Sequence, residues 1–265
     1  MGAIKVAVTG ASGKMSKEVL ATLCREDGLE PVGAVSTKAT EDYLSLPDGS
    51  GLIPLSSDLE AILARTRPDV LVDFTTADYS FSAAKLALKY GTRPVIGTSG
   101  ISQDKVAELS KLCQEKRLGA VIAPNFALGA VIMMHLAKVA APFFDYAEVI
   151  EMHHEQKADS PSGTAIATAR DMVATRGKPF SYAQTLKETL PGSRGSTVDG
   201  VAIHSLRLPG MVAHQEIVLG GLGQTLRIRH DTIGRECYMP GVVLAVKEVL
   251  DREELVYGLD KLIGL

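Results

Sequence analysis

The sequence has few cysteines and no long apolar run. The 265 residues include only Cys24, Cys113 and Cys237, which are far apart and form no Cys-x-x-Cys pair. This pattern favours neither a disulfide framework nor a thiolate zinc site, and it suits a reducing compartment. No apolar run approaches the roughly 18 residues of a membrane helix, and no signal or transit segment is seen at the N-terminus. We therefore expect a cytoplasmic protein without a membrane partner.

The sequence also lacks an excess of one charge. Its 28 Lys and Arg stand against 31 Asp and Glu, for a net charge of −3 and a pI of about 6.1. Because the basic residues are scattered among acids, a nucleic-acid partner is not expected. With 265 residues and 46% hydrophobic content, the chain is long enough for a substantial core in two domains.

The first half of the chain alternates short apolar runs with amphipathic stretches. This pattern predicts parallel strands joined by crossover helices. The expected strands are residues 4–9, 31–36, 70–74, 94–98 and 120–123, and the clearest expected helices are residues 14–25, 81–90 and 103–116.

The pattern changes after residue 125. A Met-rich helix (128–141), a strand (146–153) and a helix from residue 162 precede a Gly/Ser/Thr-rich connector (189–200), the strands 201–208, 212–219 and 224–230, and a helical end (241–250 and 254–262). We expect an α/β protein with two domains. An N-terminal Rossmann-type parallel-sheet domain would comprise residues 1–124 plus 241–265 and bind a dinucleotide. An α+β domain built on an open mixed sheet, residues 125–240, would bind the substrate.

A glycine turn follows the first expected strand. Gly10 and Gly13 lie between this strand and the first helix, with the spacing Gly-x-x-Gly-x-x-Ser in place of three glycines. The turn would bring a pyrophosphate against the helix amides, although a purely structural turn is the alternative. The residues that we assign to the cofactor here are Gly10, Ser12, Gly13, Lys14 and Met15.

The second expected strand ends without an acidic residue. A site that prefers NAD carries Asp or Glu there for the ribose hydroxyls, whereas this chain has Ser36-Thr37-Lys38. Lys38, with Lys14 nearby, favours NADPH over NADH as the cofactor, with NADH remaining possible. The alternative is that Lys38 is an ordinary exposed lysine.

Three further loops follow expected strands. Ligands bind at the carboxyl ends of strands in open α/β sheets, so small and hydroxyl-bearing residues there are candidate cofactor ligands. They are Phe74, Thr75, Gly97, Thr98, Ser99, Pro124, Asn125 and Phe126.

The most informative segment begins at His153-His154 and Lys157 and continues into Ser160-Pro161-Ser162-Gly163-Thr164. It predicts a strand end, a turn and a helix whose first amides are free to bind an anion. The imidazoles and the ammonium suit a carboxylate and the delivery of a proton. A metal site is the weaker alternative, since no HExxH motif or companion ligands are present, and histidines with a structural role are another. We expect no metal, and no short-chain dehydrogenase site, which requires Tyr-x-x-x-Lys.

The run of residues 151–165, with its His-His-x-x-Lys-x-Asp-x-Pro-Ser-Gly-Thr-Ala string, resembles the signature of the 4-hydroxy-tetrahydrodipicolinate reductase (dihydrodipicolinate reductase) family. The resemblance extends over almost the whole chain and includes Arg235, which it adds to the cofactor residues. Ser16 stands where the family usually has a third glycine, and Lys14 stands where arginine is common. These departures concern how the cofactor is held.

The resemblance implies an NAD(P)H-dependent oxidoreductase of lysine and diaminopimelate biosynthesis. It would reduce 4-hydroxy-tetrahydrodipicolinate, or dihydrodipicolinate, to tetrahydrodipicolinate. His153 would be the general acid and Lys157 its catalytic companion, while Lys157, His154, Gly163 and Thr164 would bind a carboxylate of the small dicarboxylate substrate. The family implies a homotetramer assembled through the second-domain sheet. The alternatives are an NADPH-binding redox sensor without turnover and a reductase of another amino-acid-derived imine.

Overall fold

The computed structural model describes residues 2–265 and divides into two units. The first unit comprises the chain up to Leu128 together with Arg235–Leu265, and the second is Gly129–Gly234. The sequence had suggested divisions after residues 124 and 240. The segment around Phe126 lies in the first unit because its ring is buried there and Gly241 packs against its carbonyl oxygen. A Cβ on Gly241 would come within 2.2 Å of that oxygen, so the returning chain is already in the first unit at this point.

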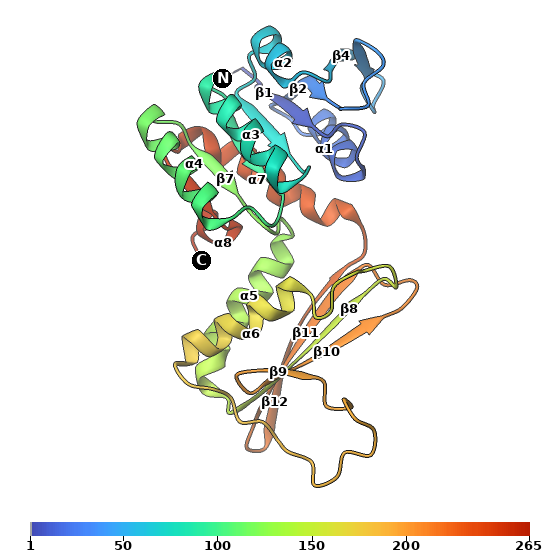
Figure 1. The fold of residues 1–265 in the computed structure, drawn as a ribbon, viewed down its shortest axis with the longest axis vertical. Coiled ribbons are helices and arrows are strands. Elements are labelled where there is room, and N and C mark those ends of the chain that lie inside the picture. The colour runs from blue at the N-terminus through green and yellow to red at the C-terminus, as the bar shows by residue number, and fades with distance from the viewer. Residues whose placement is uncertain (1) are drawn as a thin grey trace. The chain divides into compact units, whose positions relative to one another are not determined.

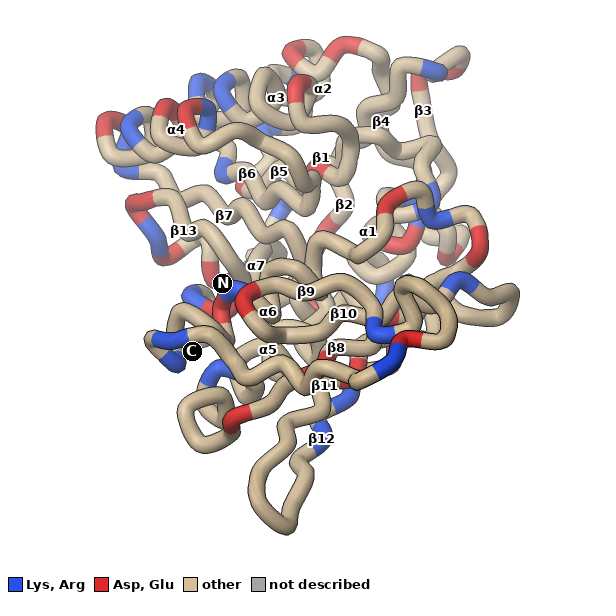
Figure 2. Tube along the Cα trace, turned by 60° about the horizontal axis from the view of Figure 1, so that its bottom comes forward, with Lys and Arg blue, Asp and Glu red and all other residues tan. Residues whose placement is uncertain are grey.

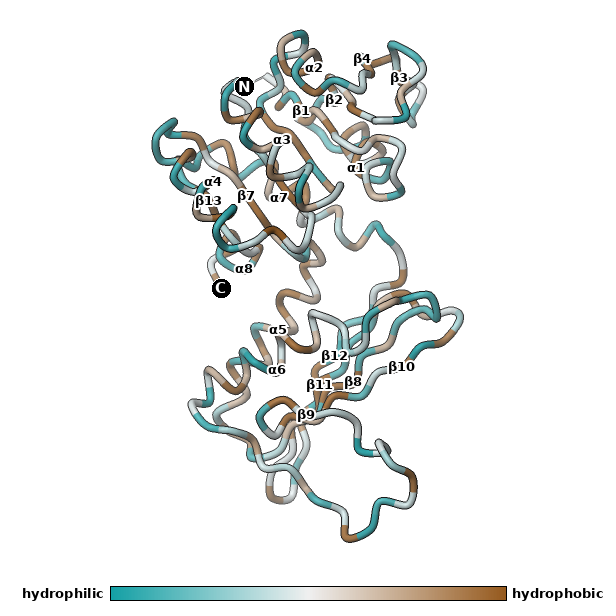
Figure 3. Tube along the Cα trace, in the orientation of Figure 1, coloured by the Kyte–Doolittle hydropathy of each residue, from teal (hydrophilic) through white to brown (hydrophobic). Residues whose placement is uncertain are grey.

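An eight-stranded sheet forms the centre of the first unit (Figure 1). All neighbouring strands are parallel except β3 and β4, which are antiparallel. The strands in spatial order are β13 (Leu255–Tyr257), β7 (Ala120–Ile122), β6 (Arg93–Ile96), β5 (Val70–Asp73), β1 (Ile4–Thr9), β2 (Leu29–Val35), β4 (Leu52–Ser56) and β3 (Tyr43–Ser45). The inner strands are apolar, as the brown trace of β7 shows in Figure 3, because helices cover them.

The helices of this unit form two groups. Helix α3 (Ala77–Lys89) packs beside α2 (Leu59–Thr66) and α4 (Gln103–Lys116), while α1 (Lys14–Arg25) packs beside α7 (Met239–Glu248). Side chains cap the N-termini of two of these helices. The Asp58 carboxylate accepts a hydrogen bond from the Glu60 amide at the start of α2, and the Ser102 hydroxyl accepts one from the Lys105 amide at the start of α4. A 3₁₀ turn (Arg235–Tyr238) leads into α7, another (Val249–Asp251) follows it, and α8 (Leu259–Leu262) ends the chain.

The second unit is built on a mixed five-stranded sheet (Figure 1). Its strands in spatial order are β12 (Gln224–Thr232), β11 (Ala213–Gly221), β8 (Tyr146–His153), β10 (Val201–Arg207) and β9 (Ser196–Val198). Only β8 and β10 are parallel. Helices α5 (Leu128–Ala140), which a 3₁₀ turn (Ala141–Phe143) follows, and α6 (Gly163–Arg176) bury one face against Val149, Ile203 and Ile217.

The structure corrects one expected element and adds four. Residues 254–262 are not a single helix, because Leu255–Tyr257 joins the first sheet parallel to β7 and Gly258, at φ +98°, separates this strand from α8. Strand β3, strand β4, helix α2 and strand β9 were not predicted. Three of these are strands of only three to five residues, too short to show a clear period.

Candidate functional site

The glycine turn of the first unit has the shape of an anion cradle. Gly10 has φ +64°, and a Cβ there would lie 2.8 Å from Thr75 Cγ2. Gly13 is the N-cap of α1 and makes no side-chain cap, and the first turn holds no acid. The amides at this helix start are therefore open to an anion, and a pyrophosphate fits the residues present. Ser16, in place of a third glycine, is buried and donates to the Thr9 carbonyl at 2.8 Å.

A hollow of about 370 Å³ lies beside this turn, where β2 ends. Ser12 and Ser36 line it with their hydroxyls 3.2 Å apart, and Lys38 lines it as well. The structure adds Lys17 to this lining, a residue that was not predicted from the sequence. It could have been found from its position one helical turn after Lys14 on α1. Lys14 and Met15 are not among the residues that line this hollow.

A buried carboxylate organises the loops at the carboxyl ends of the central strands. Asp73, 1% exposed at the end of β5, accepts hydrogen bonds from the hydroxyls of Thr9, Thr75, Ser80 and Thr98. It also accepts from the Thr75 amide at 3.0 Å. The predicted residues Thr75 and Thr98 are thus brought together by a residue that was not assigned to the site. Asp73 could have been recognised in the sequence as an acidic residue that ends an otherwise apolar strand.

The remaining predicted cofactor residues lie in different surroundings. The Phe74 ring covers Gly97 so closely that a Cβ there would be 2.0 Å from the ring, and it lies 5.5 Å from the Phe126 ring between centroids. Asn125 Oδ1 accepts from the Ala127 amide at 2.9 Å. Three predicted residues are exposed and make no side-chain hydrogen bond or ion pair within residues 2–265: Ser99, Pro124 and Arg235.

In the second unit, His153 is held at the end of β8 by a buried carboxylate. Its Nδ1 lies 2.6 Å from Oε2 of Glu151, which is 0% exposed. Arg207, on the neighbouring strand β10, donates from Nη2 to Glu151 Oε1 at 2.8 Å and from Nη1 to Oε2 at 2.9 Å. This two-pronged geometry is the strong form of a carboxylate–guanidinium pair.

The electrostatic surroundings shift both groups. Burial acts to raise the pKa of Glu151, but hydrogen bonds from Arg207 and His153 outweigh it and hold that pKa below its usual value. Burial also has the largest effect on His153 and lowers its pKa, against the opposing effect of Glu151. Lys157 and Arg207 add to the lowering. Glu151 is thus an ionised acceptor, and a pKa of His153 held below its ordinary value means that the imidazolium gives up its proton more readily.

A helix start with free backbone amides lies a few residues further along the chain. The Ser162 hydroxyl caps α6 by accepting from the Ala165 amide at 3.2 Å. Within residues 2–265, no acceptor is found for the amides of Gly163 and Thr164, and a Cβ on Gly163 would meet open space. A helix start with two free amides suits a carboxylate.

The cation predicted for this site already has a partner. Lys157 Nζ lies 2.6 Å from Asp159 Oδ1, and the Lys157 side chain is 22% exposed against 57% for Asp159. His154 follows β8 in an exposed turn and points to no partner that the structure records. The structure therefore links His153 with the α6 start, while Lys157 is paired beside them.

The distribution of charged and metal-ligating residues bears on the expected kinds of partner and site. Figure 2 shows Lys and Arg interspersed with Asp and Glu along the trace. Among residues 2–265, no group of three or more His, Cys, Asp or Glu could hold a metal, and no helix is long and apolar enough to cross a bilayer. The Tyr-x-x-x-Lys spacing of short-chain dehydrogenases does occur in this sequence, at Tyr257 and Lys261. The expectation that no such site is present therefore cannot rest on this spacing. However, Tyr257 ends β13 and Lys261 lies in α8.

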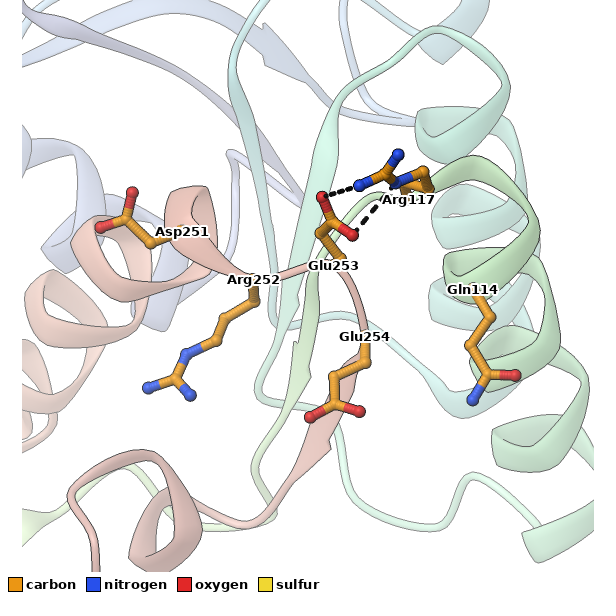
Figure 4. A pocket seen from close by; sticks show the side chains of 6 residues that line it. All are labelled: Gln114, Arg117, Asp251, Arg252, Glu253 and Glu254. Carbon is orange, nitrogen blue, oxygen red and sulfur yellow. Dashed lines mark hydrogen bonds and ion pairs between the residues drawn. The ribbon is translucent and has the colours of Figure 1, made fainter.

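A second hollow, of about 690 Å³, lies where β7 and β13 begin (Figure 4). Arg117 there donates to the Glu253 carboxylate through Nε at 3.1 Å and Nη2 at 3.0 Å. This hollow is at the amino ends of parallel strands, opposite the edge where such sheets bind ligands. We assign it no role in the site.

The glycine cradle beside a parallel sheet, the mixed sheet and the histidine–carboxylate pair are the features expected of a two-domain, pyridine-nucleotide-dependent reductase. Sequence profiles of dihydrodipicolinate reductase match almost the whole chain, the N-terminal profile over residues 4–126 and the C-terminal profile over residues 129–263. The chain therefore belongs to the dihydrodipicolinate reductase family, as its sequence resemblance predicted.

Full-length relatives agree with this assignment. The 4-hydroxy-tetrahydrodipicolinate reductase of Dehalococcoides mccartyi is 53% identical, covering 100% of both chains, and that of Moorella thermoacetica is 46% identical, covering 98% of each. A dipicolinate-bound dihydrodipicolinate reductase from Paenisporosarcina sp. TG-14 is 41% identical with a TM-score of 0.88, covering 98% of this chain and 99% of that one. An amine dehydrogenase from Mycobacterium smegmatis, at 17% identity and a TM-score of 0.68, shares the fold.

Proposed function

We propose that this chain reduces 4-hydroxy-tetrahydrodipicolinate, or the dihydrodipicolinate derived from it, to tetrahydrodipicolinate in lysine and diaminopimelate biosynthesis. The observation that carries the proposal is the junction in the second unit, where His153 and the start of α6 are bound to the same Glu151 carboxylate. The relatives from Dehalococcoides mccartyi and Moorella thermoacetica are 4-hydroxy-tetrahydrodipicolinate reductases, and the dihydrodipicolinate reductase from Paenisporosarcina sp. TG-14 has dipicolinate bound.

The residues divide the work between proton delivery and binding. When bound, a reduced nicotinamide supplies the hydride that saturates one end of a double bond. His153, as the imidazolium, gives the proton that completes the reduction at the other end. The amides of Gly163 and Thr164, with Lys157 and His154, bind a ring carboxylate, since a dianionic substrate needs donors that replace its water. The first unit would bind the nucleotide and the second the substrate.

NADPH is the cofactor that we propose, with NADH accepted more weakly. The hollow beside the glycine turn is lined by two ammonium groups, Lys17 and Lys38, and by the hydroxyls of Ser12 and Ser36. A 2′-phosphate carries charge that such groups stabilise. Glu41 also lines this hollow, but it follows β2 by six residues and does not end the strand as a ribose-binding acid would. The remaining assigned cofactor residues would surround the pyrophosphate and nicotinamide.

We also propose a cytoplasmic homotetramer that forms through the second-unit sheet. Helices α5 and α6 cover one face of this sheet, and the alternate residues along β8, β10 and β11 lie on the other. Apolar side chains on that other face, such as Ile150, Leu206 and Val218, are only half-buried in the single chain. Light scattering of the purified protein tests the oligomer, and a monomeric mass at micromolar concentration would contradict it.

The direct test of the reaction follows NADPH absorbance with freshly generated substrate, using wild type and His153→Gln. We expect oxidation of one NADPH per substrate by wild type and a loss of on the order of a hundredfold or more in the variant. NADPH binding without oxidation would support a redox sensor instead. Oxidation only with another cyclic imine would assign a related reductase.

A further inference from the structure

Strand β8 carries two glutamates, each bound to one arginine and one histidine. Glu148 pairs with Arg194 at 2.6 Å and with His204 at 2.9 Å, and its side chain is 37% exposed. Glu151 pairs with Arg207 and His153, and its side chain is fully buried. Because the two glutamates are three residues apart on a strand, they lie on opposite faces of the sheet. Their partners are alike, so burial and position distinguish them.

The Glu151 carboxylate sets the state of the His153 ring. Arg207 donates to both of its oxygens, so the carboxylate is ionised and only accepts. The 2.6 Å contact then requires a proton on His153 Nδ1, and this leaves Nε2 as the nitrogen that can serve the substrate.

The same carboxylate also fixes the start of α6. Its Oε1 accepts from the backbone amide of Ser162, the N-cap residue, at 3.2 Å. Arg207 adds a further tie, because Nη2 donates to the Asp159 carbonyl at 2.7 Å. The proton donor and the two free amides that follow Ser162 are therefore positioned by one buried group and its arginine.

We infer that Glu151 is the positioning residue of this site: it holds His153 in the Nδ1-protonated form, presents Nε2 to the substrate, and stabilises the imidazolium that gives the proton. Arg207 keeps Glu151 ionised and in place. The inference rests on the proposed role of His153 as proton donor, and it assigns a role to two residues that do not themselves contact the reacting atoms.

The charges around His153 determine the sign of the expected pH effect. Glu151 on its own strand favours the imidazolium, whereas Arg207 of β10 and Lys157 of the following loop oppose it. Asp159 of that loop is paired with Lys157, and the residue opposite His153 on β11 is Ala213, which carries no charge. Removing the Glu151 charge leaves the two cations in excess, so the pKa of His153 must fall.

The first test compares the pH profiles of kcat for wild type, Glu151→Gln and Glu148→Gln. A general acid is lost as pH rises through its pKa, so the alkaline limb should move down by about one to two pH units in Glu151→Gln. It should stay in place in Glu148→Gln, which breaks a trio of the same composition on the other face. An unmoved limb in Glu151→Gln, with dipicolinate binding retained, would overturn the inference.

A second variant separates charge from position. Glu151→Asp keeps the charge but draws the carboxylate back by one methylene, so kcat should fall on the order of tenfold or more while the alkaline limb stays near its wild-type pH. An unchanged kcat would show that the position of the carboxylate has no separate effect, and a limb shift as large as that of Glu151→Gln would show that its charge does not set the pKa of His153. Either result would contradict the inference.

A third measurement needs no variant of Glu151 and therefore does not depend on whether one folds. Long-range ¹H–¹⁵N spectra of ¹⁵N-histidine protein, with His153→Gln to assign the signal, report which ring nitrogen carries the proton. We expect the neutral form of His153 to be protonated at Nδ1, and protonation at Nε2 would overturn the inference. Because this readout needs no turnover, it is independent of whether the proposed substrate is correct.

Discussion

Replacing Lys157 with alanine should weaken the binding of pyridine-2,6-dicarboxylate without weakening that of NADPH. Lys157 lies in the second unit, four residues after His153, whereas the glycine cradle and its two lysines lie in the first. The dicarboxylate is a stable aromatic analogue of the proposed substrate. It can therefore be measured in the absence of turnover.

The magnitude follows from two opposing interactions of the ammonium. A hydrogen bond to a charged partner contributes about 1.5–3 kcal/mol. However, the ligand must compete with Asp159, whose carboxylate lies 2.6 Å from Lys157 Nζ, and an exposed ion pair of this kind contributes about 0.2–1 kcal/mol. The net loss in Lys157→Ala is about 0.5–2.8 kcal/mol, or roughly 2- to 100-fold in Kd.

The same reasoning predicts the opposite effect for Asp159→Asn. This variant frees the ammonium but keeps the backbone carbonyl that Arg207 binds, so dicarboxylate should bind up to about fivefold more tightly. Calorimetric titration of wild type and both variants measures the two effects. Lys111→Ala is the matched control, since it removes a lysine from an exposed pair with Glu115 on α4.

Two results would refute this reasoning. If Asp159→Asn binds the dicarboxylate more weakly, then Asp159 positions the ammonium and does not compete for it. If Lys157→Ala loses NADPH affinity in step with dicarboxylate affinity, the assignment of the two ligands to separate units is wrong.

Three further changes test the other parts of the site. His153→Gln should lower kcat by about a hundredfold or more and change KM little, as steady-state kinetics will show, because it removes an interaction made in the transition state. Lys38→Asp should weaken NADPH by at least about tenfold while affecting NADH less, and equal losses in fluorescence titrations would make Lys38 an ordinary surface residue. Gly97→Ala should destabilise the protein by about 1–3 kcal/mol in urea unfolding, because the new Cβ would lie 2.0 Å from the Phe74 ring. Gly51→Ala, where a Cβ meets nothing within 4 Å, should change stability little, and a loss as large as that of Gly97→Ala would contradict the steric argument.

Most of the fold could be predicted because long, regular patterns determine it. The alternation of apolar strands and amphipathic helices through residue 123 is visible without tertiary information. The end of the chain was harder, since Leu255-Val256-Tyr257 fits either a helix or a strand until its neighbour is known. Its three backbone positions pair with Ala120, Val121 and Ile122, residues more than 130 positions away. Only that pairing selects the strand.

The candidate site was predictable where its residues are adjacent in sequence. His153, Lys157 and the α6 start lie within a dozen positions, so their chemistry could be inferred from one segment. Arg207 could not be assigned, because it reaches Glu151 only through the parallel pairing of β8 and β10, 56 residues apart. Lys17 was missed for a smaller reason, since its relation to Lys38 depends on how α1 lies against the end of β2.

Two buried acidic residues can be recognised from the sequence even when the pairing of the strands is unknown. Asp73 ends the apolar run Val70-Leu71-Val72, and Glu151 interrupts a strand whose inward-facing neighbour is Val149. A carboxylate in either place loses its water on folding, and this costs several kcal/mol unless other donors replace it. An acid in a buried strand therefore implies a set of donors gathered around it.

The two sets of donors differ in a way that matches the proposed ligands. Neutral hydroxyls and one amide donate to Asp73 and so tie it to the loops of the first unit. Glu151 instead has an arginine and a titratable histidine, so its charge is matched and also linked to a proton. The first arrangement suits a group that only positions loops. The second suits a group that must stabilise a proton donor through a change of charge, and this difference is why the alkaline limb of the pH profile should respond to Glu151.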